Sequence, residues 1–295
     1  LFGIPASCLP QVRASDAGFG TTIGSGLLPA GIPVAAVLAD SHAALYHHGC
    51  TVPGEGKATY GTGSSIMTPA SGPDLAPAGI ATTVAWKVGQ VATYAREGNI
   101  VASGSALDWM ARTLGAPQGI SGGAFLTQLA AEVPDTAGVS FVPAFTGLAA
   151  PYMDRAATGL LSGVTAGTTR AHLARAALEA VANQVADVVE AIEADGKARI
   201  DVLHADGGAT ASGLLMQLQA DLLGRSVLVA DAPEASALGA ALLAARTLGL
   251  DAWEPEPGSQ VEPHHVERTT RRRQWERAVA RSRGHAVTPD GPTPR

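Results

Sequence analysis

The chain has 295 residues, of which 46% are hydrophobic, 16% charged and 4% aromatic, and its formal net charge is −6. This composition is typical of a globular α/β protein and excludes a disordered or fibrous chain, and the acidic balance argues against nucleic acid or an anionic membrane as a partner. The sequence contains no run of 18 apolar residues, so no membrane span is predicted. The two cysteines, Cys8 and Cys50, are too few for a disulfide framework, so we expect a cytoplasmic setting.

The first half of the chain predicts strands and one short helix. Residues 32–40 (IPVAAVLAD) are predicted to form a buried strand that ends in Asp40. Residues 56–68 and 82–98 are predicted to form hairpins, because β-branched and aromatic residues flank glycine turns. Residues 105–115 are predicted to form a short helix that ends at its last glycine.

The second half predicts alternating helices and strands. Residues 170–195 carry apolar side chains at helical spacing, with Thr169 as a predicted N-cap, and form the longest predicted helix. After it we expect strands over 199–209 and 226–230 and helices over 212–223 and 235–248. Such alternation indicates an α/β layered fold.

The character of the sequence changes after Trp253. We therefore expect one domain over residues 1–253, and a Pro/Glu linker with an Arg-rich helix and tail over 254–295. The stretch 266–283 is predicted to be a solvated terminal helix with Trp275 packed back on the body. A nucleic-acid patch is disfavoured there because only one aromatic residue accompanies the charges.

Two glycine turns could approach a ligand closely. Gly207 and Gly208 stand between a predicted strand and a predicted helix, and Gly61, Thr62 and Gly63 form the tip of the first hairpin. Backbone amides at such turns, together with a hydroxyl, suit phosphate oxygens. Ordinary tight turns would give the same pattern, and neither turn has the spacing of a Rossmann or Walker motif.

Asp40 has two readings that the local sequence leaves open. A carboxylate before a helix is often an N-cap, but it can also accept a proton in phosphoryl transfer to an alcohol. Together with two phosphate-binding turns it forms a kinase-like set. His42, His47 and His48 lack partners at metal-ligand spacing, so no metal site is assigned. No GxSxG elbow is present, which disfavours a Ser/His/Asp hydrolase.

Several motifs resemble those of the FGGY carbohydrate kinases, in the order in which that family has them. "LADSHAAL" resembles the family's phosphate segment, "KATYGTGSS" its Y-G-T-G turn, and "DGGATASGLLMQLQADLLGRSV" its adenosine segment. The stretch 159–179 resembles its second signature through Gly159, Leu161, Gly163, Val164, His172, Leu173, Ala176, Leu178 and Glu179. The resemblance covers most of residues 4–253.

The resemblance implies an actin-like ATPase (ribonuclease H-like) fold that binds ATP and Mg²⁺. It implies that Asp40 is the catalytic base and that Asp40 and Ser41 face the acceptor. The residues that it implies to contact the nucleotide are Gly61, Thr62, Gly63, Gly104, Asp108, Gly207, Gly208 and Ser212.

Departures from the pattern bear on the substrate. Ser41 and Ser65 replace a Gln and a Phe of glycerol kinases, so a sugar or polyol other than glycerol is expected, with a pentulose such as xylulose favoured. Ser212 replaces an Asn beside adenine.

The family's N-terminal domain with its D-x-G-T motif is not recognised before Leu1. We therefore expect the C-terminal half of a two-domain kinase, inactive or weakly active without that domain or a homo-oligomer partner. The alternatives are a non-catalytic nucleotide-binding module and another actin-fold ATPase.

Overall fold

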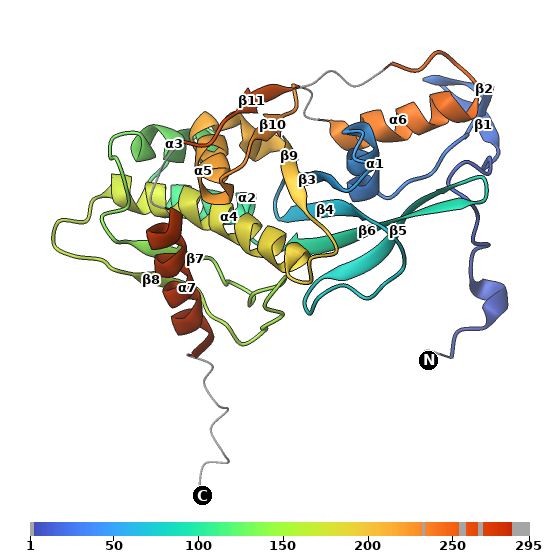
Figure 1. Ribbon diagram of the computed structural model, residues 1–295. Coiled ribbons are helices and arrows are strands. Elements are labelled where there is room, and N and C mark those ends of the chain that lie inside the picture. The colour runs from blue at the N-terminus through green and yellow to red at the C-terminus, as the bar shows by residue number, and fades with distance from the viewer. Residues whose placement is uncertain (1–2, 232–233, 254–257, 265–267, 285–295) are drawn as a thin grey trace, which may run out of the picture.

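The computed structural model describes residues 3–231, 234–253, 258–264 and 268–284. Its centre is a mixed sheet of seven strands in the order β11-β10-β9-β3-β4-β6-β5 (Figure 1). Strand β9 runs parallel to both β3 and β10, and the other neighbouring pairs are antiparallel. The strands are β3 (Gly54–Tyr60), β4 (Ser64–Ala70), β5 (Ala81–Val88), β6 (Val91–Ile100), β9 (Ile200–Asp206), β10 (Val227–Val229) and β11 (Ser259–Val261).

The two predicted hairpins are confirmed as β3–β4 and β5–β6. Successive side chains of a strand point to opposite faces, so the residues of β3 divide between two environments. Ala58 and Tyr60 belong to the larger apolar core, whereas Lys57 and Thr59 point to the other face. The face that a residue of this sheet occupies therefore decides whether it packs or remains available for polar contacts.

The larger core lies between the sheet and four helices, α2 (Gly104–Thr113), α3 (Gly122–Ala130), α4 (Arg170–Glu193) and α5 (Gly213–Leu223). The long predicted helix is confirmed as α4, with Thr169 as its N-cap and His172 Nδ1 accepting from the Thr169 N–H at 3.0 Å. A Cβ on Gly98 of β6 would lie 2.4 Å from a methyl carbon of Val188. Gly98 therefore allows α4 to approach the sheet closely.

The opposite face of the sheet carries two helices, α1 (Asp40–His47) and α6 (Ala235–Thr247). Leu45 of α1 and Leu242 of α6 form a second apolar cluster with Met67 of β4 and other buried side chains. A Cβ on Gly239 would lie 1.8 Å from the carbonyl oxygen of Ala43, so the two helices touch backbone to backbone where they cross. Helix α1 is thereby held on the face of the sheet opposite to α2, α3, α4 and α5.

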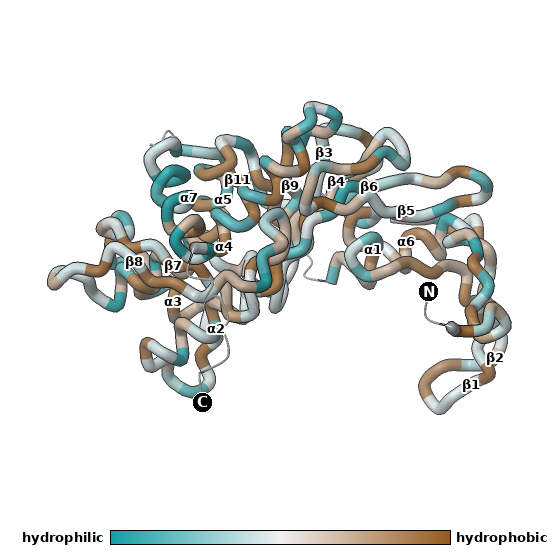
Figure 2. The backbone as a smooth tube through the Cα atoms, turned by 90° about the horizontal axis from the view of Figure 1, so that it is seen from below, coloured by the Kyte–Doolittle hydropathy of each residue, from teal (hydrophilic) through white to brown (hydrophobic). Residues whose placement is uncertain are grey.

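The predicted buried strand over 32–40 is wrong. Strand β2 (Leu28–Pro33) ends at Pro33 and pairs only with β1 (Thr21–Ser25), in a hairpin that stands apart from the large sheet (Figure 2). The N–H groups of Val34 and Val37 donate to the carbonyl oxygens of Gly20 and Ser15. Because these donors are used by the preceding segment, 34–39 joins no sheet, and Asp40 begins a helix instead.

The remaining predicted elements are largely confirmed. Helices α2, α5 and α6 and strands β9 and β10 match the predictions over 105–115, 212–223, 235–248, 199–209 and 226–230. Several short elements were not predicted. They are the β1–β2 hairpin, α3, the strands β7 (Ser140–Val142) and β8 (Leu160–Ser162), which pair with each other, and β11, which lies within the predicted linker. Within the described part of the chain, no helix has the length and hydrophobicity to cross a membrane.

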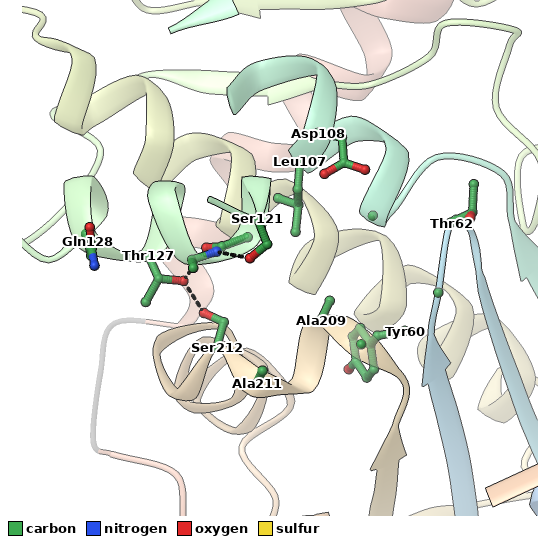
Figure 3. A pocket seen from close by; sticks show the side chains of 15 residues that line it. Tyr60, Thr62, Leu107, Asp108, Ser121, Thr127, Gln128, Ala209, Ala211 and Ser212 are labelled. Atoms are coloured by element: carbon green, nitrogen blue, oxygen red, sulfur yellow. Dashed lines mark hydrogen bonds between the residues drawn. The ribbon is translucent and has the colours of Figure 1, made fainter. Parts of the chain in front are cut away.

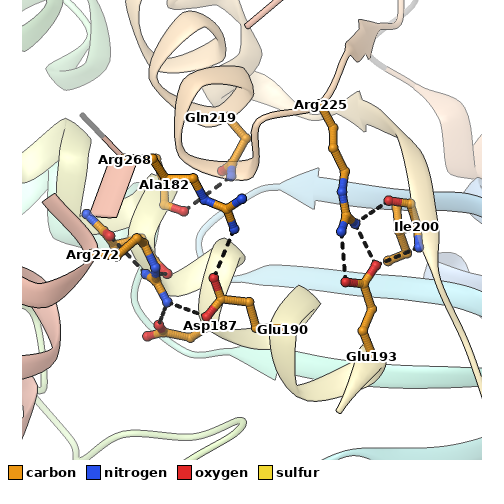
Figure 4. A network of polar contacts seen from close by, with 10 residues as sticks. Ala182, Asp187, Glu190, Glu193, Ile200, Gln219, Arg225, Arg268 and Arg272 are labelled. Carbon is orange, nitrogen blue, oxygen red and sulfur yellow. Dashed lines mark hydrogen bonds and ion pairs between the residues drawn. The ribbon is translucent and has the colours of Figure 1, made fainter. Parts of the chain in front are cut away.

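The predicted terminal helix is present as α7 (Arg268–Gly284). Trp275 is 3% exposed, so it packs back on the body as predicted, but Arg272 is also buried, and the helix is therefore less solvated than predicted. Figure 4 shows Arg272 directed at Asp187 and Glu190 of α4. Part of the predicted linker (254–257 and 265–267) and the tail 285–295 lie outside the described residues.

Candidate functional site

A cavity of about 570 Å³ lies beside the carboxyl ends of β3 and β9 (Figure 3). Its walls come from the β3–β4 turn, from α2, from α3 and from the segment that leads into α5. Small-molecule sites commonly have volumes of about 300–1,000 Å³. The cavity is therefore large enough for a ligand of nucleotide size.

The first wall is the tip of the β3–β4 hairpin. Thr62 is exposed there, and its carbonyl oxygen accepts from the backbone N–H groups of Ser103 at 3.1 Å and Ser105 at 3.0 Å. A Cβ on Gly63 would lie 2.2 Å from the carbonyl oxygen of Ile100, and one on Gly104 would lie 2.6 Å from that of Gly61. These glycines let the hairpin tip rest directly on the amino end of α2, which makes one rigid wall.

The second wall is the turn after β9. Gly207 has a φ of +94°, and a Cβ there would lie 2.6 Å from the carbonyl oxygen of Tyr60, so this position favours glycine on two grounds. Gly208 lines the cavity, and a Cβ on it would meet no atom within 4 Å. A side chain at Gly208 would therefore project into open space beside the cavity, where the ligand is expected.

The third wall is α3, which the sequence analysis missed. Ser121 caps this helix by accepting from the Ala124 N–H at 3.3 Å. Thr127 Oγ1 lies 2.6 Å from Ser212 Oγ, and Ser212 caps α5 by accepting from the Leu215 N–H (Figure 3). A serine before a run of apolar residues was an available signal for α3, but its two opening glycines disfavour a helix.

The structure brings most of the predicted nucleotide-site residues together. Gly63 and Gly207 are not among the lining residues but hold the two turns in place. The predicted residues that line the cavity are Gly61, Thr62, Gly104, Asp108, Gly208 and Ser212. Their contact with a nucleotide stays a prediction.

Asp40 and Ser41 lie elsewhere, at the start of α1 and outside the lining of the cavity. The Asp40 carboxylate is exposed and accepts from the Ser41 N–H at 2.6 Å. The N-cap position itself belongs to Ala39. Asp40 is therefore a first-turn residue whose carboxylate remains open to solvent on the α1 side of the sheet.

Lys57 is a buried cation that interacts electrostatically with Asp206, at the end of β9, and with Asp40. The sequence analysis did not single it out. Its side chain is fully buried on the α1 face, where Nζ donates to Thr59 Oγ1 at 3.1 Å and to Ser65 Oγ at 3.2 Å. Burial lowers the pKa of Lys57 to about 8, against the opposing effect of nearby carboxylates that include Asp206 and Asp40. The available signal was a lysine between the small residues Gly56 and Ala58 of a predicted strand.

Asp206 is the second buried charge at this junction. It is 2% exposed, and Oδ2 lies 2.7 Å from Nε2 of His48, just beyond α1. The ring of His204 lies 5.2 Å from that of His48, and burial lowers the pKa of His204 to about 4. Among the described residues no group of three or more His, Cys, Asp or Glu side chains could hold a metal ion by itself.

Residues 56–248 match the FGGY family of carbohydrate kinases, C-terminal domain. Over 295 residues the chain is 46% identical to apulose kinase from Pectobacterium atrosepticum, with 96% of this chain and 58% of that protein covered. It is 43% identical to glycerol kinase from Alkalilimnicola ehrlichii, with 97% and 58% covered. The chain thus spans about 58% of the length of these curated relatives.

Solved structures show the same arrangement of elements. Glycerol kinase from Plasmodium falciparum, solved with ADP, superposes with a TM-score of 0.81 at 28% identity, covering 94% of this chain and 56% of that one. Xylulose kinase from Rhodospirillum rubrum superposes with a TM-score of 0.76 at 30% identity, covering 94% and 57%.

Proposed function

The chain belongs to the FGGY family of carbohydrate kinases and has the actin-like ATPase fold of its structural neighbours, and on this basis we propose that its cavity binds ATP for transfer of a phosphoryl group to a hydroxyl of a sugar or polyol. The observation that carries the proposal is the cavity between two glycine turns. It brings together turn and helix backbone that suits phosphate oxygens with apolar walls that suit a base.

The residues present fit a nucleotide. Thr62 offers a hydroxyl at the hairpin tip beside the amino end of α2, which suits the phosphates. Leu107 and Ala209 offer apolar surface, and the empty space beside Gly208 leaves room for the nucleoside. The Plasmodium glycerol kinase neighbour was solved with ADP, which supports the same class of ligand here.

Asp40 is the carboxylate of this chain that would hold Mg²⁺ together with phosphate oxygens. Mg²⁺ usually binds through one or two protein carboxylates, several waters and the substrate phosphates. When bound, the ion neutralises charge on the phosphates.

We assign the proton transfer to Asp40. The acceptor hydroxyl oxygen attacks the γ-phosphorus, its proton passes to the Asp40 carboxylate, and the bond between the γ-phosphorus and the bridging oxygen of ADP breaks. The exposed Asp40 carboxylate, engaged by the Ser41 N–H at one oxygen only, keeps the other free for a proton.

The acceptor that we propose is a ketose, with a pentulose such as xylulose favoured. Ser65 lies half-buried on the α1 face, where Lys57 donates to its hydroxyl, and Ser41 follows the proposed base. Two small hydroxyl side chains leave room for a polyhydroxylated substrate. Apulose kinase and xylulose kinase among the relatives and neighbours support this class, whereas the glycerol kinases support a smaller polyol.

We further propose that residues 1–295 alone have little or no kinase activity. They span about 58% of the length of their relatives, and Asp40 is exposed while Ser41 and Ser65 are only partly buried. The second candidate is a nucleotide-binding module that needs another chain for catalysis. Both candidates require that the cavity binds nucleotide.

Replacing Gly208 with Leu tests the proposal. The new side chain enters the space beside the cavity, so we expect ADP to bind at least about tenfold more weakly in isothermal titration calorimetry. Gly213→Leu is the matched control, because a Cβ there also meets no atom within 4 Å but Gly213 does not line the cavity. Equal affinity of ADP for both variants and the wild type would contradict the assignment.

A further inference from the structure

The cavity wall formed by α3 and α5 contains a continuous line of hydrogen bonds. Thr127 Oγ1 donates to the carbonyl oxygen of Gly123 at 2.8 Å. Ser212 Oγ lies 2.6 Å from Thr127 Oγ1 and accepts from the Leu215 N–H at 3.2 Å. In Figure 3 this wall lies across the cavity from Thr62, so a nucleotide with its phosphates near Thr62 would place its base here.

The direction of each bond in this line follows from the number of hydrogens. A hydroxyl has one hydrogen to donate, and a carbonyl oxygen has none. The Thr127 hydrogen is used on Gly123, so the hydrogen between the two hydroxyls belongs to Ser212. Both hydroxyls therefore donate within the protein, and only their remaining lone pairs are left for a base.

The other side chains at this end of the cavity also present no hydrogen-bond donor in a fixed direction. Leu107, Ala124 and Ala211 offer apolar contact only. Gln128 is exposed, and its amide can turn to donate or to accept. The Ser121 hydroxyl accepts from the Ala124 N–H, and its own hydrogen can rotate. The side chains of this wall thus hold a flat ring by contact and offer its polar edge no matching pair of fixed donor and acceptor.

We propose, on the basis of the proposed nucleotide site, that this cavity binds adenine and guanine nucleotides with similar affinity. The fixed lone pairs of Thr127 and Ser212 can accept from the amino group of adenine or from that of guanine. Sites that hydrogen-bond a substrate group specifically reject its analogue by far more than about 100-fold, because buried polar groups are then left unpaired. Here we expect ADP and GDP to differ by less than about tenfold.

Isothermal titration calorimetry of the 295-residue chain with ADP, GDP and inorganic pyrophosphate tests the proposal. The expected result is similar affinity for ADP and GDP and at least about tenfold weaker binding of pyrophosphate, which lacks a base to bury. ADP binding with rejection of GDP by more than about 100-fold would overturn this inference alone. Absence of binding by all three would overturn the inference together with the proposed nucleotide site.

A second measurement uses Ser212→Ala. The substitution removes the hydroxyl from the wall, and we expect the affinities for ADP and GDP to move together, with their ratio unchanged within about threefold. A selective loss of ADP affinity would show that Ser212 reads adenine and would overturn the proposal. Because Ser212 also caps α5, circular dichroism confirms folding of the variant first, and the wild-type comparison stands without it.

Discussion

Asp40 combines two properties that a proton acceptor needs. It stands in the first turn of α1, where the helix dipole favours a negative charge, and its carboxylate is exposed. Lys57 adds a buried positive charge nearby, which Asp40 and Asp206 in turn favour. The charges of Asp40 and Lys57 therefore lie on the α1 face of the sheet, whereas the walls of the cavity lie on the opposite face.

In an active kinase that contains this chain, Asp40→Asn is expected to lower kcat by at least about 100-fold, because the amide cannot take the hydroxyl proton. The affinity for ADP, measured by calorimetry, should stay within a few-fold, because Asp40 does not line the cavity. Asp74→Asn, at an exposed position, serves as the control. An unchanged kcat in Asp40→Asn would remove it from the role of base.

Lys57 makes a testable contribution to stability against pH. Its pKa of about 8 in the folded chain lies below the ordinary value of 10.5, so between these values the unfolded chain binds more protons. The free energy of unfolding should therefore rise with pH across this window, by about 3 kcal/mol relative to Lys57→Met. Urea unfolding of both proteins between pH 7 and 10.5 measures the difference.

The control for this comparison is Lys197→Met, since Lys197 is exposed. That variant should keep the wild-type dependence on pH. A Lys57→Met protein whose stability follows the wild type at every pH would show that Lys57 has the same pKa in the folded and unfolded chains, contrary to the lowering of its pKa by burial.

At the scale of elements, α7 is attached to α4 by buried polar contacts rather than by apolar packing alone. Arg272 donates to Asp187 at 2.6 Å and to Glu190 at 2.9 Å (Figure 4). The Trp275 indole N–H also donates to Asp187, at 2.7 Å. Burial raises the pKa of Asp187 against the lowering effect of Arg272 and these hydrogen bonds. The Arg-rich composition of the helix therefore serves an attachment to the body.

Arg272→Met should lower the free energy of unfolding by about 3–5 kcal/mol, because it leaves the buried Asp187 carboxylate without its cation. Arg273→Met, one residue further along and exposed, should change it by less than about 0.5 kcal/mol. Chemical denaturation of both variants makes the comparison. Equal stability of the two would show that the Arg272 network contributes nothing net.

For the whole molecule, one sheet separates the two parts of the proposed site. The nucleotide cavity lies with α2, α3 and α5, whereas Asp40 lies on the α1 side, and the β3 and β9 ends connect the two. The β1–β2 hairpin stands off with Ile23 and Leu27 at 97% and 96% exposure. The proposed nucleotide site and the proposed proton acceptor Asp40 thus lie on opposite sides of the sheet, and Asp40 is exposed.

The 295-residue chain is expected to bind ADP but to release none from ATP when xylulose, glycerol or another acceptor is added. The proposed proton acceptor Asp40 is exposed in this chain, and water-excluded positioning of both reactants supplies much of the rate in phosphoryl transfer. A coupled assay of ADP release measures this. Acceptor-dependent turnover above about 1 s⁻¹, an ordinary kinase rate, would contradict the expectation.

The sequence by itself determined most elements, the two glycine turns and the family. Hydrophobic periodicity and glycine turns are local properties, so the two hairpins, α4 with its cap at Thr169 and the helix after Gly208 were predictable. The prediction of a buried strand over 32–40 was wrong because it also used only a local pattern. Small apolar residues suit a buried strand and an extended connection alike. Hydrogen bonds to segment 15–20, far from any local pattern, decided between them.

Only the tertiary structure decided which side chains share an environment. The pairing of β3 with β4 and β9 buries Lys57 beside Thr59 and Ser65, and the approach of α3 to the segment that leads into α5 joins Thr127 to Ser212. Thr127 and Ser212 come from distant parts of the chain. Thr59 and Ser65 lie near Lys57 in the sequence, but the burial of Lys57 with them depends on sheet register and helix packing. These distances and degrees of burial cannot be predicted from one sequence, because the contacts that determine them form only when the chain folds.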